Sequence, residues 1–471
     1  MDQFDAVIVG SGPNGLAAAI TLQKQGLSVI MLEEKSTAGG GVRSAEWTLP
    51  GFLHDCCSSV FPLAVQSEFF DTLPLQELGL EFITPSSFAV HPFDNGSVFS
   101  FQQSVTDTAT QFENDRIAYE NLVQPLLRSW PTIRENFLAP FHISRSLLKM
   151  TSFAWKALQP SIRFAESEFE TEKMKAAWAG MAAHSMLPLH RTATSAFALM
   201  MLLAGHDKGW PIAKGGAQAI ANTLVHHFLS LGGRLELNHR VSSLKELPPA
   251  RLYFFDISPA QLLKIAGEKF SSLYRWQLKK YKYGMGVYKI DWALSQPIPF
   301  TNEACRQSAT VHLGGSFEEI VTSEWNAAND RESDCPFVIL TQPSLFDKRA
   351  PGNNHTAWAY CHVPNGFDKS MKIAIEKQIE RFAPGFTDCI LATFESTPES
   401  LENYNANYIG GDINGGRQDI TQLFCRPALR WSPYKTSRKN MYICSSSTPP
   451  GGGVHGLCGY YAARKALMEL L

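Results

Sequence analysis

Apolar residues near the beginning of the chain are arranged as two strands around a helix. Residues 6–9 (AVIV) are all apolar and stop at Gly10, as in a strand buried on both faces of a parallel sheet. Residues 16–22 are mostly small or apolar and suit a helix packed closely on that sheet. Residues 28–32 (SVIML) predict a second buried strand, which ends at Glu33. The pattern therefore predicts a βαβ unit.

Three glycines lie between the first predicted strand and the helix. Gly10, Gly12 and Gly15 form the pattern G-x-G-x-x-G. The first glycine allows a tight turn, the second lets the backbone approach a pyrophosphate, and the third brings helix and strand together. Glu33 stands about 20 residues further on, where an acid can accept hydrogen bonds from a ribose. A glycine-rich turn without a ligand is the alternative, but strand, helix and acid together favour a dinucleotide site at the helix N-terminus.

Later patterns alternate between strands and helices. The turn Asp94-Asn95-Gly96 separates two alternating apolar segments and predicts a β-hairpin. Residues 107–203 follow a helical pattern, and residues 234–244 are typical of a strand. Residues 270–414 mix strands with a helix, as in an α+β region. A short apolar run, residues 441–444, leads through a glycine-rich turn into a last predicted helix.

Composition limits the classes of partner. Only 18% of the 471 residues are charged, against about 25% in a typical protein, and phenylalanine occurs 30 times. Such a chain suits a large apolar interior, either a tunnel for an apolar substrate or simply a large core. The net charge of −2 provides no field that would attract a nucleic acid, so we expect no nucleic acid partner.

The cysteines and histidines show no metal-binding or disulfide pattern. The nine cysteines include no C-x-x-C pair, and buried thiols are the expected state even for the neighbours Cys56 and Cys57. No paired cysteines follow the second strand, which disfavours the flavin disulfide reductases. His312, His355 and His362 lack the spacing of metal ligands, so no metal site is expected.

One segment has the composition of a helix at a membrane surface. The chain begins MDQFDAV and contains no run of 18 or more apolar residues, so we expect a cytoplasmic protein without a transmembrane helix. No acidic residue lies between Glu135 and Glu166, where four basic residues alternate with aromatic and aliphatic ones. This pattern indicates peripheral membrane contact or, equally, an amphipathic helix packed on the protein's own core. The basic residues are Arg145, Lys149, Lys156 and Arg163.

With these motifs the chain resembles the phytoene desaturase-related (phytoene dehydrogenase-like) family of FAD oxidoreductases. A second glycine pair just after Glu33 resembles the extended fingerprint of FAD enzymes. The resemblance covers nearly the whole chain and rests on the segments VIVGSGPNGLAAAITL, LPGFLHDCCSS, AAHSMLPLHR, GWPIAKGGAQAIA, GVYKIDWAL, AWAYCHVPNG, YIGGDINGG and CSSSTPPGGGVHG.

The resemblance implies an α/β fold with a discontinuous, Rossmann-type FAD-binding domain, an α+β substrate domain and a helical insertion. We expect the FAD domain over 1–62, 205–265 and 415–471, the substrate domain over 63–105 and 266–414, and a helical substrate or membrane-contact region over 106–204.

It also implies a set of FAD contacts. The residue matching Val241 holds the adenine through its backbone, and the glycine-rich turn near the C-terminus runs beside the flavin. Ser445, Ser446 and Ser447 replace an acid that many flavoproteins carry there. The candidate cofactor-binding residues are Gly10, Gly12, Gly15, Glu33, Gly39, Gly40, Arg43, Val241, Gly452, Gly453 and Val454.

We interpret the chain as an FAD-dependent desaturase or dehydrogenase that moves a hydride from an apolar, isoprenoid or carotenoid-like substrate to the flavin N5. The alternatives are an isomerase or saturase of similar substrates, and a flavin-bearing membrane or partner-binding protein with little turnover. Because only one dinucleotide fingerprint is present, oxygen or a quinone is the expected electron acceptor. His455 is the candidate acid–base residue, with His184 and Asp412 as alternatives.

Overall fold

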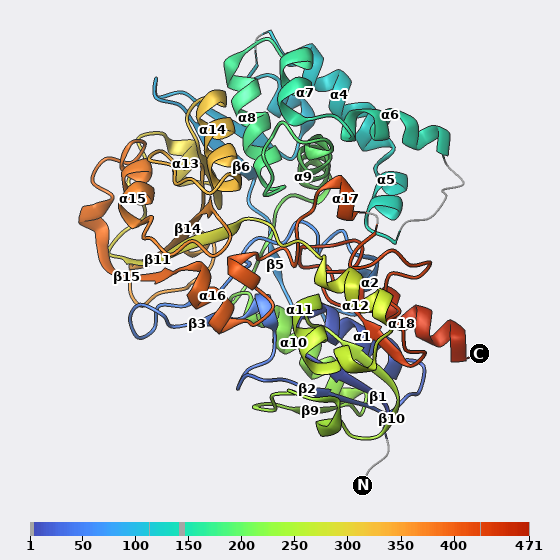
Figure 1. Ribbon diagram of the computed structural model, residues 1–471. Helices are drawn as coiled ribbons and strands as arrows, with labels where there is room; N and C mark the ends of the chain where they lie inside the picture. Colours follow the sequence, from blue (N-terminus) through green and yellow to red (C-terminus); the bar gives the residue numbers. More distant parts are fainter. Residues whose placement is uncertain (1–3, 113, 141–146, 424, 471) are drawn as a thin grey trace.

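Two sheets and a group of helices organise the chain. The structure, a computed structural model, describes residues 4–112, 114–140, 147–423 and 425–470. In Figure 1 a five-stranded sheet lies at the bottom, near the N-terminus, a larger sheet lies on the left, and the helices between α4 and α9 lie at the top. The expected α/β fold class is confirmed.

The five-stranded sheet is parallel throughout. Its strand order is β16-β10-β1-β2-β9, so strands from the beginning, the middle and the end of the chain lie side by side. The β9 strand is much shorter than the strand expected over 234–244. Its bounds and those of the other strands are β1 (Phe4–Val9), β2 (Val29–Leu32), β9 (Arg234–Glu236), β10 (Ala250–Phe255) and β16 (Met441–Ile443).

Helices cover both faces of this sheet. The helix that follows the glycine loop, α1 (Pro13–Gln23), packs against α10 (Gln218–Ser230) and α18 (Leu457–Leu470) on one face. On the other face α11 (Pro259–Ala266) and α12 (Ser272–Lys279) bury their apolar sides. The strands are therefore apolar on both sides, as the continuous run at 6–9 predicted.

The larger sheet has seven strands in a mixed arrangement. Its order is β15-β11-β14-β13-β12-β6-β7, in which only β12 and β6 pair parallel. The expected hairpin at Asp94-Asn95-Gly96 joins β6 and β7. The bounds are β6 (Ser87–Pro92), β7 (Val98–Gln102), β11 (Gly286–Leu294), β12 (Thr310–Leu313), β13 (Val338–Thr341), β14 (His355–Val363) and β15 (Ile390–Ser396).

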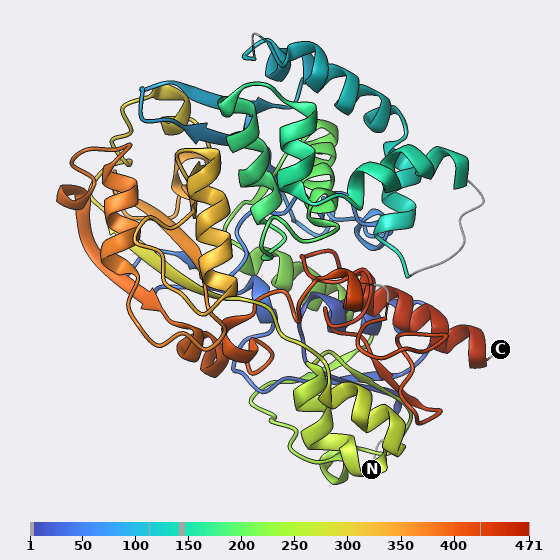
Figure 2. The same ribbon diagram turned by 45° about the horizontal axis from the view of Figure 1, so that its top comes forward.

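Helices gather at the end of the molecule opposite the five-stranded sheet (Figure 2). No helix among the described residues is long and apolar enough to cross a membrane. The helices of this group are α4 (Arg116–Arg128), α5 (Trp130–Phe137), α6 (Leu147–Ala157), α7 (Ser161–Glu168), α8 (Glu172–Ala183) and α9 (Thr194–Lys208).

Short elements complete the fold. The remaining helices are α2 (Glu68–Asp71), α3 (Val105–Ala109), α13 (Glu303–Arg306), α14 (Phe317–Ala328), α15 (Lys372–Glu380), α16 (Pro398–Tyr404) and α17 (Ile420–Leu423). The remaining strands, each of two residues, are β3 (Ser44–Ala45), β4 (His54–Asp55), β5 (Phe82–Ile83) and β8 (Ile212–Ala213).

Two glycines set how closely the first and last helices approach the glycine loop. A methyl group at Gly15 would overlap the carbonyl oxygen of Gly10, so α1 can begin directly above β1 only with glycine there. A methyl group at Gly459, in the first turn of α18, would overlap the carbonyl oxygen of Asn14 in α1. The N-terminal ends of α1 and α18 therefore lie against each other.

We predict that Gly459→Ala lowers the free energy of unfolding by about 2 kcal/mol, because the methyl group must push α1 and α18 apart. Gly267→Ala is the matched control, because the nearest atom to a methyl group at Gly267 is 3.6 Å away and its backbone is helical. Urea unfolding followed by circular dichroism measures both. Equal stability of the two variants would contradict the close approach of these helices.

Candidate functional site

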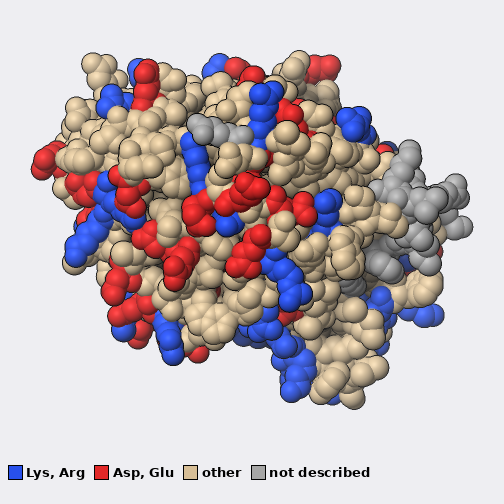
Figure 3. Space-filling view, turned by 90° about the horizontal axis from the view of Figure 1, so that it is seen from above, with Lys and Arg blue, Asp and Glu red and all other residues tan. Residues whose placement is uncertain are grey.

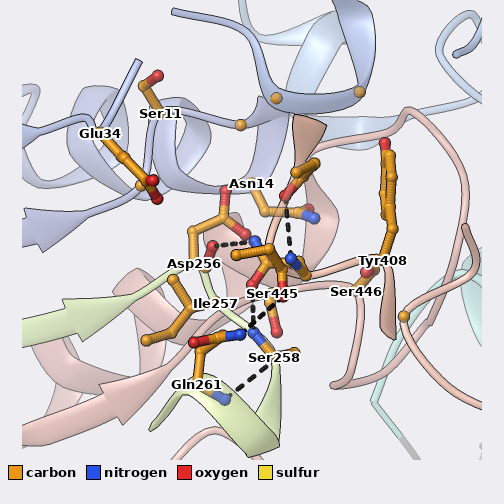
Figure 4. A pocket seen from close by; sticks show the side chains of 18 of the residues that line it. Ser11, Asn14, Glu34, Asp256, Ile257, Ser258, Gln261, Tyr408, Ser445 and Ser446 are labelled. Carbon is orange, nitrogen blue, oxygen red and sulfur yellow. Dashed lines mark hydrogen bonds between the residues drawn. The ribbon is translucent and has the colours of Figure 1, made fainter. Parts of the chain in front are cut away.

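A cleft runs along the carboxyl ends of the parallel strands. Its volume is about 340 Å³, and segments that follow β1, β2, β10 and β16 all contribute to its wall. Figure 4 shows Ser11 and Asn14 from the glycine loop and α1 on one side, with Ser258 and Gln261 from the segment after β10 on the other. Ligands of open α/β sheets bind at this edge.

Glu33 is fixed at the end of β2. One oxygen of its carboxylate, Oε2, accepts hydrogen bonds from the backbone N–H (2.9 Å) and the hydroxyl (2.5 Å) of Ser11, and Oε1 accepts from the N–H of Lys35 (2.9 Å). A carboxylate has about four acceptor positions, so one remains for a ligand hydroxyl. Glu33 therefore both ties the glycine loop to β2 and stays able to bind a ribose.

Gly39 and Gly40, the glycine pair after Glu33, pack on the glycine loop that follows β1. Gly10 has a φ of +97°, the turn conformation that glycine adopts without strain. A methyl group at Gly40 would lie 3.0 Å from the Cα of Gly12, and the N–H of Gly39 donates to the carbonyl of Ser11 (3.1 Å). Gly39 and Gly40 thus support the glycine loop after β1 and make the cleft narrower.

The opposite wall comes from the C-terminal segment and from the loop before it. Ser445, Ser446 and Ser447 line the cleft directly after β16. The carbonyl of Ser446 accepts a hydrogen bond from Nη2 of Arg426 (2.8 Å), which is completely buried. Arg43 lies on the ring of Tyr404, with Cζ 4.1 Å from the ring centre. Two arginines therefore hold the backbone around this end of the cleft.

Most of the expected cofactor-binding residues lie on the cleft wall. Gly15 and Gly39 stand behind the wall and shape the loops, and Gly452 faces a second cavity instead. The residues on the wall are Gly10, Gly12, Glu33, Gly40, Arg43, Val241, Gly453 and Val454.

The second cavity, of about 230 Å³, is lined mainly by apolar and aromatic side chains. It lies between the seven-stranded sheet and α9, with further wall residues from the end of α5, from the segment after α8 and from the C-terminal glycine turn. The lining includes Phe61, Leu63, Phe137, Leu138, Phe197, Met200, Met201, Trp210, Ile339, Trp358 and Tyr360.

The cleft and the apolar cavity meet. Six residues line both, from the loop after β4, from the segment before α17 and from the C-terminal glycine turn. Beyond Met186, which also lines the apolar cavity, a third space of about 290 Å³ extends toward the surface. The residues shared by the cleft and the apolar cavity are Cys57, Ser58, Ile413, Asn414, Gly453 and Val454.

His455 lies in the wall of the apolar cavity, next to this junction. The N–H of Leu457 donates to Nδ1 of His455 (3.0 Å), so the ring proton of the neutral imidazole is on Nε2. Burial lowers the pKa of His455 to about 4, and Nε2 has no hydrogen-bond partner within the described part of the chain. His455 therefore presents an N–H donor whose partner must come from outside these residues.

The two alternative acid–base candidates differ in position. His184 lines the apolar cavity, with its Nε2 3.1 Å from Nε2 of His312, and burial lowers the pKa of His184 to about 3. Asp412 lines neither space. Its carboxylate accepts the N–H groups of Gly284 (2.6 Å) and Asn414 (2.8 Å), and burial raises its pKa. Asp412 thus positions Asn414 at the junction.

Two acidic or basic residues near the site were not predicted from the sequence. Asp256 follows β10 on the cleft wall, as Glu33 follows β2, so an acid at the end of an apolar strand was the available signal. Lys289 is 3% exposed, pairs with Asp291, and lies 4.8 Å from the ring centre of Trp358. It places a positive charge behind the apolar wall, and no local sequence pattern marks this.

The cleft fits a dinucleotide. Its floor is a glycine loop at a helix N-terminus, its end at β2 carries a carboxylate with an acceptor position to spare, and a second glycine turn borders its other end. All nine cysteines are free, including the neighbours Cys56 and Cys57 near the junction. The structure agrees with the expectation that the thiols are unpaired.

The sequence is similar to known oxidoreductases. A family model described as an NAD(P)-binding Rossmann-like domain matches residues 8–73. The pyridine nucleotide-disulfide oxidoreductase domain-containing protein 2 of Mus musculus is 24% identical, over 99% of this chain and 94% of its own length. The lycopene-forming phytoene desaturase of Pseudescherichia vulneris is 23% identical, over 98% of each chain.

Solved structures share the fold over the full length. Putrescine oxidase bound to putrescine aligns with a TM-score of 0.65 and 15% identity, over 100% of this chain and 99% of that one. Cyclohexylamine oxidase from Brevibacterium oxydans IH-35A aligns with a TM-score of 0.61 and 14% identity, over 100% of both chains. At these identities the likeness establishes the fold.

We predict that Glu33→Ala raises the dissociation constant of the dinucleotide by roughly tenfold to a hundredfold, the effect of losing one hydrogen bond to a charged acceptor. Glu34→Ala is the control, since Glu34 lies on the same wall with its side chain 35% exposed and makes no contact with Ser11. Fluorescence titration of the apoprotein gives both constants. A Glu33→Ala protein that binds as tightly as wild type would remove Glu33 from the site.

Proposed function

We propose that this chain, an FAD-dependent oxidoreductase related to the phytoene desaturases, withdraws hydrogen from an apolar substrate of isoprenoid or carotenoid type. The observation that supports the substrate class is the junction between the dinucleotide cleft and the apolar cavity. A cofactor in the cleft would reach its reacting partner through residues that line both spaces, and those partners would be surrounded by aromatic and aliphatic side chains.

The residues of the cleft suit FAD in one orientation. Glu33 would bind the ribose of the adenosine, and the backbone of Val241 would border the adenine. The N–H groups at the start of α1 would hold the diphosphate. Gly453 and Val454, which line both spaces, would border the isoalloxazine, so its reacting edge would face the apolar cavity.

The chemistry that FAD supplies when bound is acceptance of a hydride at N5. The chain itself would then have two tasks, to hold a C–H bond of the substrate at the junction and to keep water away from it. The walls at Phe61, Trp210 and Trp358 serve both, since their large ring surfaces bury an apolar chain.

We retain His455 as the candidate acid–base residue; in a dehydrogenation the proton paired with the hydride would leave to solvent, because the neutral ring already carries its proton on Nε2. Because Nδ1 is engaged by Leu457, the group available to a substrate or cofactor atom is the Nε2–H, so donation is the role that this geometry favours. An isomerase or a saturase would need such a donor at the same place, and these remain the alternative reactions. A protein with little turnover is the third alternative.

We expect His455→Ala to keep bound FAD but to lower the rate of anaerobic flavin reduction by substrate by roughly a hundredfold, the scale of a lost acid–base group. The substrate is found first, by screening isoprenoid hydrocarbons for anaerobic loss of flavin absorbance. His355→Ala, at a half-buried position of β14 outside both spaces, is the control. An unchanged rate in His455→Ala would leave His455 a packing residue.

The source and the acceptor of the flavin's electrons distinguish a dehydrogenase from a saturase. Among the described residues we find one glycine-rich dinucleotide cleft, so we propose oxygen or a quinone as the acceptor. Stopped-flow mixing with NADH or NADPH should then reduce the flavin slowly or not at all. Fast and saturable reduction by either nucleotide would contradict this proposal and favour a saturase.

We also propose that the helical region contacts a membrane surface. Trp155 on α6 is 75% exposed and Leu158, directly after the helix, is 44% exposed, while Phe153 and Ala157 on the other side of the helix are buried. The helix therefore has both an apolar inner side and apolar residues in solvent. Arg145 lies outside the described residues, and the structure describes no side chain for Lys149.

Charge on this end of the molecule is low and mixed. Figure 3, seen from above, shows acidic and basic side chains interspersed among broad uncharged areas. Lys156 and Arg163 flank the exposed part of α6 and the start of α7, which would favour anionic lipids by about 1 kcal/mol each.

We predict that Trp155→Ala/Leu158→Ala reduces flotation with anionic liposomes severalfold, because membrane contact at α6 depends on these exposed apolar side chains. The control is Ile373→Ala/Leu391→Ala, which removes two apolar side chains of similar exposure from α15 and β15. A second variant, Lys156→Gln/Arg163→Gln, should lower binding to anionic but not to neutral liposomes. Equal flotation of all variants would return α6 to a purely structural role.

A further inference from the structure

Asp256 occupies a central position beneath the glycine loop. It directly follows β10, and its backbone N–H donates to the carbonyl of Val9 at the end of β1 (2.8 Å). Its side chain is 8% exposed and lies on the wall of the cleft (Figure 4). The carboxylate therefore stands where the loop meets the ligand space.

All three glycines of the loop face Asp256. A methyl group at Gly10 would lie 2.8 Å from its carbonyl oxygen, and one at Gly12 would lie 2.6 Å from Oδ2. The N–H of Gly15 donates to Oδ2 (2.8 Å). One of the N–H groups at the start of α1, which in such loops serves the diphosphate, is thus already bonded to a carboxylate.

Among the described residues, no cation bonds to this carboxylate. Glu33, at the end of β2, is the charged group that acts on it, and Glu33 is negative. Cys444 after β16 and Cys458 in α18 face it as neutral thiols, because burial raises their pKa. Asn407 and the glycine loop contribute only neutral polar groups.

The lysines and arginines on the cleft wall stay apart from it. In the described part of the chain, Asp256 forms no ion pair with any of them; they are Lys35, Arg43, Arg240 and Lys264. Burial, together with the charge of Glu33, raises the pKa of Asp256 to about 7, while the N–H groups of Gly15 and Gly12 act in the opposite direction.

We propose that Asp256 binds FAD as the neutral acid, donating a hydrogen bond toward the diphosphate, so that FAD binding takes up one proton from solution. This inference rests on the cofactor and is independent of the substrate. A carboxylate anion in this place would face both Glu33 and the two negative charges of the diphosphate without a cation to balance them. Protonation removes that repulsion and supplies a donor.

FAD should bind more weakly as the pH rises above neutral. In the apoprotein the carboxyl loses its proton near neutral pH, whereas bound FAD raises its pKa further. Below about pH 7 the acid is already protonated and FAD affinity is constant. Above this value each pH unit should raise the FAD dissociation constant by up to about tenfold, until the carboxyl of the complex also ionises.

The test titrates the apoprotein, prepared by removing FAD, with FAD between about pH 6 and about pH 9, using the quenching of flavin fluorescence. The wild type should show the slope of one proton per FAD. Asp256→Asn should abolish the slope and bind FAD at least as tightly at the alkaline end, because an amide keeps the acceptor for Gly15 and supplies a permanent donor. Glu34→Gln is the control: it removes a charge from the same wall and should keep the slope.

Calorimetry on the wild type gives an independent readout. Titrations at about pH 8 in buffers of different ionisation enthalpy should show uptake of close to one proton per FAD bound. Tight FAD binding without pH dependence or proton uptake would overturn the proposal and leave the cofactor assignment intact, as would a slope that persists in Asp256→Asn. Failure to bind FAD at any pH would contradict the cofactor assignment itself.

Discussion

The whole site depends on backbone atoms that approach closer than any side chain would allow. Gly15 lets α1 start against the carbonyl of Gly10, and Gly459 lets α18 start against the carbonyl of Asn14. Because the N-terminal ends of α1 and α18 lie against each other, the glycine turn before α1 and the glycine turn before α18 both reach one cleft. The parallel sheet contributes its carboxyl edge, where Glu33 and Asp256 stand at the ends of β2 and β10, the two strands that flank β1.

This arrangement explains how a nucleotide site and an apolar cavity come together. The C-terminal turn that begins α18 has one side on the cleft and the other on the cavity, so Gly453 and Val454 line both. The seven-stranded sheet, α5, α9 and the segment after α8 supply further walls of the cavity. Asp412 and Arg426 bond to backbone groups around the junction and hold it in place.

Local patterns were enough to find the cleft. The apolar run before Gly10, the glycine spacing and Glu33 are features of one continuous segment, and the turn at 94–96 joined the two strands expected there. The apolar cavity was not readable in the same way, because its wall combines residues from 57 to 455 that meet only in the folded chain. The strand predicted from periodicity over 234–244 is too long. β9 ends at Glu236, because only three residues pair with β2. Lys289 shows the same limit, since Trp358, beside which it lies, is far away in sequence, whereas Asp256 carried the local signal of an acid after an apolar strand.

The central claim is that the reacting edge of the bound flavin faces the apolar cavity. Titration of the holoprotein with an isoprenoid hydrocarbon in detergent micelles, followed by the visible absorption of the flavin, tests it most directly. The wild type and Met468→Trp, altered at an exposed position of α18, should show a saturable shift of the flavin band, whereas Met201→Trp, which fills the cavity, should not. No shift in the wild type, or an equal shift in Met201→Trp, would contradict the claim.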